Sequence, residues 1–162
     1  MRKQHIVEFR KRRGTTLLPQ EGIRISLNPM ERTLYRLFVA HPEGITSDNL
    51  LAHWKELCSI YENESCFDDK TLREGALESL CAESNTVFYS TVSRIKKKLV
   101  SALGRRKASP YIIQRDKNGL YKTRARLQDH KNCYDSPGKM STFEKKKPLC
   151  SRPEIECPTS KW

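Results

Sequence analysis

The chain has 162 residues, of which 31 are Lys or Arg and 19 are Asp or Glu, so its formal net charge is +12. This length suits one domain with a tail and excludes two large domains. No apolar run approaches the roughly 20 residues of a membrane helix, and the N-terminus lacks the apolar segment of a secretory signal. We therefore expect a cytoplasmic protein that makes no membrane contact.

Charge is segregated along the sequence. Residues 41–83 contain three basic and ten acidic side chains, whereas residues 84–124 contain eleven basic side chains and one acid. Most of the net positive charge therefore lies in about a quarter of the chain. A concentrated basic stretch is typical of a surface that binds a polyanion, and nucleic acid is the leading candidate.

The first half of the chain predicts two strands and three helices. Strand-forming residues occupy 5–9 and 23–27, joined by a basic, turn-rich connection. Asn28, Pro29 and Glu31 suit the N-cap, first turn and capping box of a helix that ends before Pro42. A very short strand at 45–46 and a helix capped by Thr46 or Ser47 follow, and then an acidic helix at 69–82. The residues expected to face inward are Leu50, Leu51, Trp54, Leu57, Cys58 and Tyr61, then Leu72, Ala76, Leu77 and Leu80.

A fourth helix is predicted from a cap at Ser84 or Asn85 to about Leu103, where Gly104 stops it. Its apolar stripe contains Phe88, Val92, Ile95 and Leu99. The opposite arc mixes short hydroxyls with long cations: Thr86, Ser90, Ser93, Arg94, Lys97 and Ser101, flanked by Tyr89, Lys96 and Lys98. One side of this helix thus suits a core and the other suits a polyanion.

A basic β-hairpin is predicted next, with strands at 111–115 and 120–123 around the turn at 116–119. The Asn118-Gly119 pair is a strong hairpin signal because both residues tolerate positive φ. Prolines and the loss of periodicity predict a flexible basic tail at 127–162, so the folded domain is expected at 1–126.

The residues that perform chemistry in enzymes form no recognisable pattern here. The six cysteines include no C-x-x-C pair, and the four histidines share no metal-ligand spacing with a carboxylate or a cysteine. A glycine-rich phosphate loop is also missing. We therefore expect no enzymatic activity, no cofactor and no metal site.

Four motifs, in order, resemble the winged helix-turn-helix effector domain of OmpR/PhoB-type response regulators. They are Leu-Asn-Pro-Met-Glu at 27–31 with Leu34, His-Pro-Glu-Gly-Ile-Thr-Ser at 41–47 with Leu50, Leu51 and Trp54, Val-Ser-Arg-Ile-Lys-Lys-Lys-Leu at 92–99, and Tyr-Ile-Ile at 111–113 with Gly-Leu-Tyr at 119–121. The likeness covers roughly residues 5–124. Three features depart from the family: these 162 residues include no receiver domain, the connection before the fourth helix is expected to carry its own acidic helix, and the wing turn differs.

The resemblance implies an α+β winged helix-turn-helix with short N-terminal strands and a C-terminal hairpin wing. It also implies a transcription regulator that binds double-stranded DNA, with the helix at 84–103 in the major groove and the wing at 111–124 on the adjacent groove or backbone. The candidate DNA-binding residues are Thr86, Tyr89, Ser90, Ser93, Arg94, Lys97 and Lys98 on the helix, and Arg115, Lys117 and Lys122 on the wing. Dimeric or tandem binding is compatible with a module of this size.

The alternative is a winged helix used for protein interaction. In that case the acidic helix at 69–82 is the working surface, and the acidic segment 62–83 contacts RNA polymerase or another protein, with weak or no DNA binding.

Overall fold

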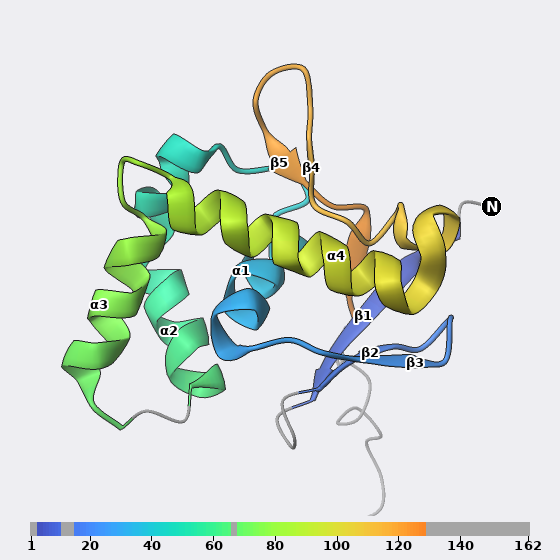
Figure 1. The fold of residues 1–162 in the computed structure, drawn as a ribbon, viewed down its shortest axis with the longest axis horizontal. Coiled ribbons are helices and arrows are strands. Elements are labelled where there is room, and N and C mark those ends of the chain that lie inside the picture. Colours follow the sequence, from blue (N-terminus) through green and yellow to red (C-terminus); the bar gives the residue numbers. More distant parts are fainter. Residues whose placement is uncertain (1–2, 11–14, 66–67, 129–162) are drawn as a thin grey trace, which may run out of the picture. The chain divides into compact units, whose positions relative to one another are not determined.

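A computed structural model describes residues 3–10, 15–65 and 68–128, which belong to one compact unit of mixed α+β structure (Figure 1). The α+β class is thereby confirmed. In chain order the elements are β1 (His5–Arg10), β2 (Thr15–Leu18), β3 (Ile23–Ser26), α1 (Pro29–Ala40), the 3-10 helix η2 (Ser47–His53), α2 (Trp54–Glu64), α3 (Lys70–Leu80), α4 (Thr86–Ala108), β4 (Gln114–Arg115), β5 (Tyr121–Lys122) and β6 (Ala125–Leu127).

The N-terminal sheet has the strand order β3-β2-β1-β6. Strands β1, β2 and β3 pair antiparallel, and β6 adds parallel to β1 with His5 opposite Ala125. Two of these strands were not predicted. Strand β2 lies within the expected connection, because the turn residues Pro19 and Gly22 mark only the turn into β3. Strand β6 has only three residues and is formed by pairing with a distant strand, so no local pattern identifies it.

Helix α1 is central to the core and begins as predicted. Asn28 caps it, and a capping box joins Asn28 and Glu31. Leu34, Leu37 and Phe38 are completely buried. These contacts explain why a helix of only three turns is stable here, since tertiary packing supplies most helical stability in proteins.

The second predicted helix begins as the 3-10 helix η2 and continues as α2, with Thr46 as its first cap. A 3-10 helix has three residues per turn, so the α-helical face assignment fails in this segment. Leu50 and Leu57 are buried as expected, but Leu51 is 61 % exposed and Trp54 is only partly buried.

Helix α3 packs against α2 and α4 through its C-terminal half, where Leu77 and Leu80 are buried. Leu72 was expected to face inward but is 60 % exposed. The acidic helix is therefore confirmed as an element, whereas its N-terminal turn leaves an apolar side chain in solvent.

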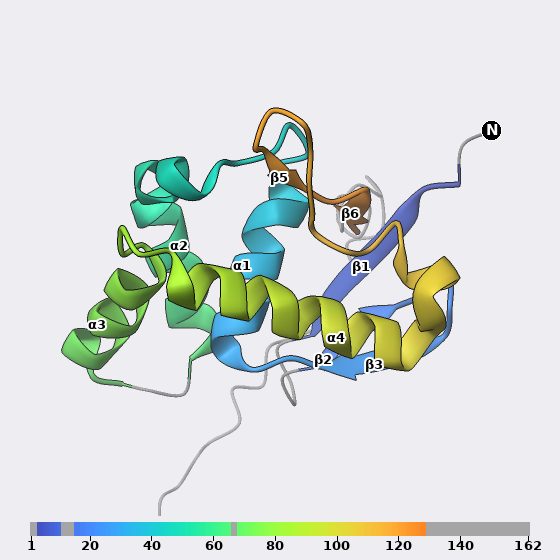
Figure 2. The same cartoon turned by 45° about the horizontal axis from the view of Figure 1, so that its top comes forward.

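Helix α4 crosses the described part of the chain, and the β4–β5 hairpin lies beside it (Figures 1 and 2). Gly104 interrupts α4 with φ 76°, as its predicted role as a stop requires. The hairpin strands have two residues each, fewer than predicted, but Ile45 extends them by pairing with Tyr121. Gly44 makes this pairing possible, because a Cβ there would lie 3.2 Å from the carbonyl oxygen of Tyr121.

The described residues continue two positions past the predicted domain end at 126. Leu127, assigned to the tail from sequence, belongs to β6, and the amide of Gln128 donates to the carbonyl of Val7. The predicted flexible tail otherwise lies outside the described residues, together with Cys133, Cys150 and Cys157.

Candidate nucleic-acid interface

Helix α4 presents the predicted polar and basic residues on the side opposite its buried stripe. Phe88, Ile95 and Leu99 are buried, as expected, and Thr91 joins them with its hydroxyl donating to the carbonyl of Val87 at 2.7 Å. Val92 is only partly buried. The helix residues predicted to bind DNA are exposed or half-buried: Thr86, Tyr89, Ser93, Arg94 and Lys97 are exposed, and Ser90 and Lys98 are half-buried.

Tyr89 connects the outer side of α4 to the hairpin. Its ring packs edge-on against Phe88 at 5.6 Å and lies 6.4 Å from the ring of Tyr121 on β5. It nevertheless stays 47 % exposed. Burial, with the nearby Tyr89 adding to it, raises the pKa of Tyr121. Tyr89 therefore supports the hairpin with one edge and keeps the rest of its ring accessible.

The other flank of α4 borders β3. A groove of about 660 Å³ lies there, lined by Arg94, Lys97 and Lys98 of α4 and by Arg24 of β3. Sequence analysis missed Arg24 as a candidate site residue. The available signal was its outward position in the alternating Ile23-Arg24-Ile25 pattern, but only the fold places that strand beside α4.

Two of the predicted contact lysines are held by acids within the protein. Lys98 Nζ lies 2.5 Å from Oε2 of Glu31, whose side chain is 2 % exposed. Lys122 Nζ lies 3.0 Å from Asp116 on the hairpin. The Lys122 hydrogen bond lowers the pKa of Asp116, with help from the amides of Leu120 and Asn118.

The remaining basic residues are less restrained. Arg94 and Lys97 on α4, and Arg115 and Lys117 on the hairpin, are exposed. No ion pair joins them to another residue among those described. These four cations therefore remain available to a bound anion, whereas Lys98 and Lys122 are already paired with acids of the protein.

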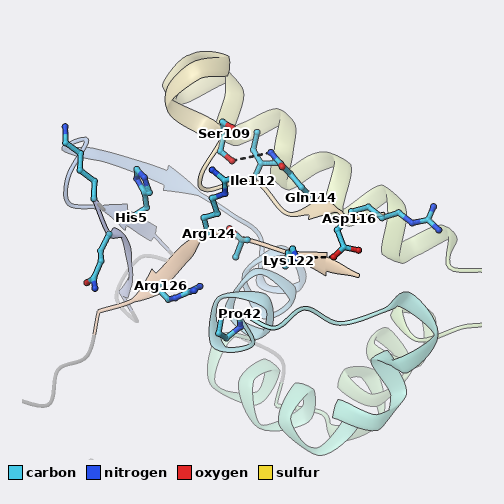
Figure 3. A pocket seen from close by; sticks show the side chains of 13 residues that line it. His5, Pro42, Ser109, Ile112, Gln114, Asp116, Lys122, Arg124 and Arg126 are labelled. Carbon is cyan, nitrogen blue, oxygen red and sulfur yellow. Dashed lines mark hydrogen bonds and ion pairs between the residues drawn. The ribbon is translucent and has the colours of Figure 1, made fainter. Parts of the chain in front are cut away.

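A second concave surface, the basic groove, lies on the hairpin's side toward β1 and β6 (Figure 3). Its volume is about 1080 Å³, and Asp116 is the one acid in its lining. The cations that line it are Lys3, Arg115, Lys122, Arg124 and Arg126. Lys3 and Arg126 were not identified from sequence, because strand pairing between β1 and β6 brings them to the hairpin.

The histidines are not all scattered in space, contrary to their sequence spacing. His41 follows α1, His53 ends η2 and Glu56 lies in the first turn of α2, yet their ligand atoms lie within 4.8 Å of one another. His41 Nε2 is 2.8 Å from Glu56, and its Nδ1 is 2.8 Å from Glu43. Burial lowers the pKa of His41, but the hydrogen bonds to Glu56 and Glu43 outweigh burial and raise it overall.

The acidic segment forms a third concave surface, the acidic groove. Leu51, Trp54, Glu74, Glu78 and Cys81 line a groove of about 650 Å³ between the η2–α2 segment and α3. Among the described cysteines, Cys58 and Cys81 are free thiols that pack partly against the core.

A comparison of the chain with models of known protein families, with characterised protein sequences and with solved structures found no match. Within the described ranges, no helix is both long enough and apolar enough to cross a membrane.

Proposed function

We propose that this protein is a winged helix-turn-helix regulator of transcription that binds double-stranded DNA. In this proposal α4 is the recognition helix and enters the major groove, and the β4–β5 hairpin is the wing that contacts the adjacent groove or backbone. The observation that carries the proposal is that α4 has one face buried in the core and an exposed outer face. Arg94 and Lys97 project from that face without an ion-pair partner among the described residues.

The position of the hairpin also supports the proposal of DNA binding. Tyr89 packs against Tyr121, and Ile45 pairs with Tyr121 through two backbone hydrogen bonds of 2.9 Å. The hairpin is therefore held next to the N-terminal half of α4. A helix and a hairpin fixed side by side contact DNA as one unit, which lowers the entropy lost on binding.

Phosphate neutralisation supplies most of the affinity in this mechanism. Arg94, Lys97, Arg115 and Lys117 provide four unpaired cations, and each phosphate contact releases counterions. In this proposal Arg94 recognises the base sequence by donating two hydrogen bonds to guanine, and the hydroxyls of Thr86 and Ser93 contribute further base contacts. Since one arginine contributes about 1–3 kcal/mol of base discrimination, we expect modest specificity.

Fluorescence anisotropy of the full chain on random-sequence duplex DNA tests this function. The variant Arg94→Glu/Lys97→Glu is expected to lose binding while keeping its circular dichroism spectrum. The matched control is Lys55→Glu/Lys70→Glu, which changes the net charge equally at exposed positions of α2 and α3. Equal affinities of both variants, or no binding by the unmodified chain at 50 mM salt, would overturn the proposal.

The acidic groove supports a second candidate function, the docking of a basic protein partner such as a subunit of RNA polymerase. Its apolar side chain Leu51 is exposed, and Glu74 and Glu78 lie on its border. Replacing Asp68, Asp69, Glu74 and Glu78 by the corresponding amides is expected to weaken partner capture while leaving DNA affinity unchanged. Capture that survives these four changes would count against docking at this surface.

A further inference from the structure

The histidine cluster, defined as His41, His53 and Glu56, lies apart from the proposed DNA-binding residues. Its three side chains come from the end of α1, the end of η2 and the first turn of α2. The rings of His41 and His53 meet edge-on with centroids 4.6 Å apart. Both rings direct a nitrogen to the same carboxylate oxygen of Glu56, at 2.8 Å from His41 and 3.5 Å from His53.

We propose that His41, His53 and Glu56 form a binding site for a divalent transition-metal ion of the Zn²⁺ type. Two imidazoles with one carboxylate are a ligand set that zinc accepts, with a water molecule in the fourth position. Zinc–ligand bonds of about 2.0–2.1 Å place tetrahedral ligand atoms about 3.3 Å apart. The distances of 2.8 and 3.5 Å to Glu56 lie on either side of that value.

The surroundings of His41 fit this role. Its second ring nitrogen, Nδ1, is 2.8 Å from a carboxylate oxygen of Glu43. A histidine that binds a metal through one nitrogen commonly donates from the other to a carboxylate, which fixes the ring and its tautomer. Glu43 is placed to do this and is itself not needed as a ligand.

The position of His53 also fits a ligand better than a structural cap. His53 is the N-cap residue of α2, yet its side chain makes no capping hydrogen bond. All three side chains are between one-fifth and two-fifths exposed, so an ion and a water molecule have access from solvent. Binding would tie the turn after α1 to the start of α2.

Cobalt uptake by the reduced 162-residue chain tests the site, with Co²⁺ used as a spectroscopic substitute for Zn²⁺. We expect one Co²⁺ per chain in equilibrium dialysis, with weak visible bands and no intense thiolate charge-transfer band, because the ligands are nitrogen and oxygen. His53→Gln and Glu56→Gln are expected to abolish this binding. Glu43→Gln is expected to weaken it by about 10- to 100-fold, the usual effect of losing an outer-shell partner.

A control variant separates this site from another histidine of the chain. His130→Gln, which removes a histidine outside the cluster, is expected to bind Co²⁺ like the unmodified chain. Circular dichroism checks that each variant folds, and a rise in unfolding midpoint with Zn²⁺ that is absent in Glu56→Gln provides a second readout. Unchanged uptake in both His53→Gln and Glu56→Gln, a thiolate band, or no uptake by the unmodified chain would overturn the proposal.

Discussion

Lys97 and Lys98 are neighbours in sequence, but the structure gives them different roles. Lys97 is exposed and forms no ion pair with a described residue, whereas Lys98 bonds the buried carboxylate of Glu31. That carboxylate also accepts from the amide of Asn28 at 3.0 Å, as part of the cap of α1. We therefore expect Lys98→Ala to reduce stability and Lys97→Ala to leave it unchanged.

The size of the effect follows from the burial of Glu31. A hydrogen bond to a charged group contributes about 1.5–3 kcal/mol, but the Lys98 side chain is 40 % exposed, so water compensates part of the loss. We expect Lys98→Ala to lower the free energy of unfolding by about 1–2 kcal/mol, which lowers the midpoint by about 3–8 °C. Lys97→Ala is expected to stay within about 0.5 kcal/mol of the unmodified protein.

Thermal and urea unfolding of both single variants measure this difference. The variant Glu31→Gln/Lys98→Ala is the control, because glutamine preserves the capping box and removes the buried charge. We expect it to regain part of the lost stability. Equal stabilities of Lys97→Ala and Lys98→Ala would refute the assignment of Lys98 to the core-facing ion pair.

Three further predictions concern a buried ion pair, a buried tyrosine and a turn glycine. Glu64→Gln is expected to lower the free energy of unfolding by about 3 kcal/mol in urea titrations, because Glu64 is the buried carboxylate that Arg32 of α1 bonds. Burial raises the pKa of Tyr35 far above its usual value of about 10, so the native state keeps this proton while the unfolded state releases it. The buried Tyr35 therefore leaves the free energy of unfolding unchanged below about pH 10 and lowers it above that pH by up to about 1.4 kcal/mol per pH unit. Tyr35→Phe is expected to lack this decrease in alkaline unfolding curves. Parallel curves for Tyr35→Phe and the unmodified protein would contradict the prediction. Gly44→Ala is expected to cost about 1–3 kcal/mol in thermal unfolding, because its φ of 96° and the nearby carbonyl of Tyr121 both exclude a side chain; an unchanged midpoint would contradict this.

Local patterns predicted the helices well. The capping box at Asn28 and Glu31 and the glycine at 104 each act within a few residues, and both appear in the structure. The face of α4 was also predictable, because a regular helix turns by a constant angle per residue. The buried faces of η2 and of the first turn of α3 were predicted wrongly, because Leu51 and Leu72 were expected to face inward and are exposed.

Features that depend on contacts between segments far apart in the sequence could not be predicted from the sequence alone. β6 exists because it pairs with β1, and Arg24 and Lys3 join the basic surfaces only through the sheet. The ion pair between Lys98 and Glu31 could not be predicted, because the sequence does not show that Glu31 lies beside α4. The His41–His53 contact has the same origin, since η2 brings His53 back toward the end of α1.

A titration of the ¹⁵N-labelled full chain with a random-sequence DNA duplex, followed by amide chemical shifts, tests the central claim most directly. DNA binding through α4 and the wing predicts that the largest shifts fall in 86–97 and 115–122, while amides of 70–80 on α3 stay nearly unchanged. The largest shifts on α3, or no shifts at low salt, would contradict it.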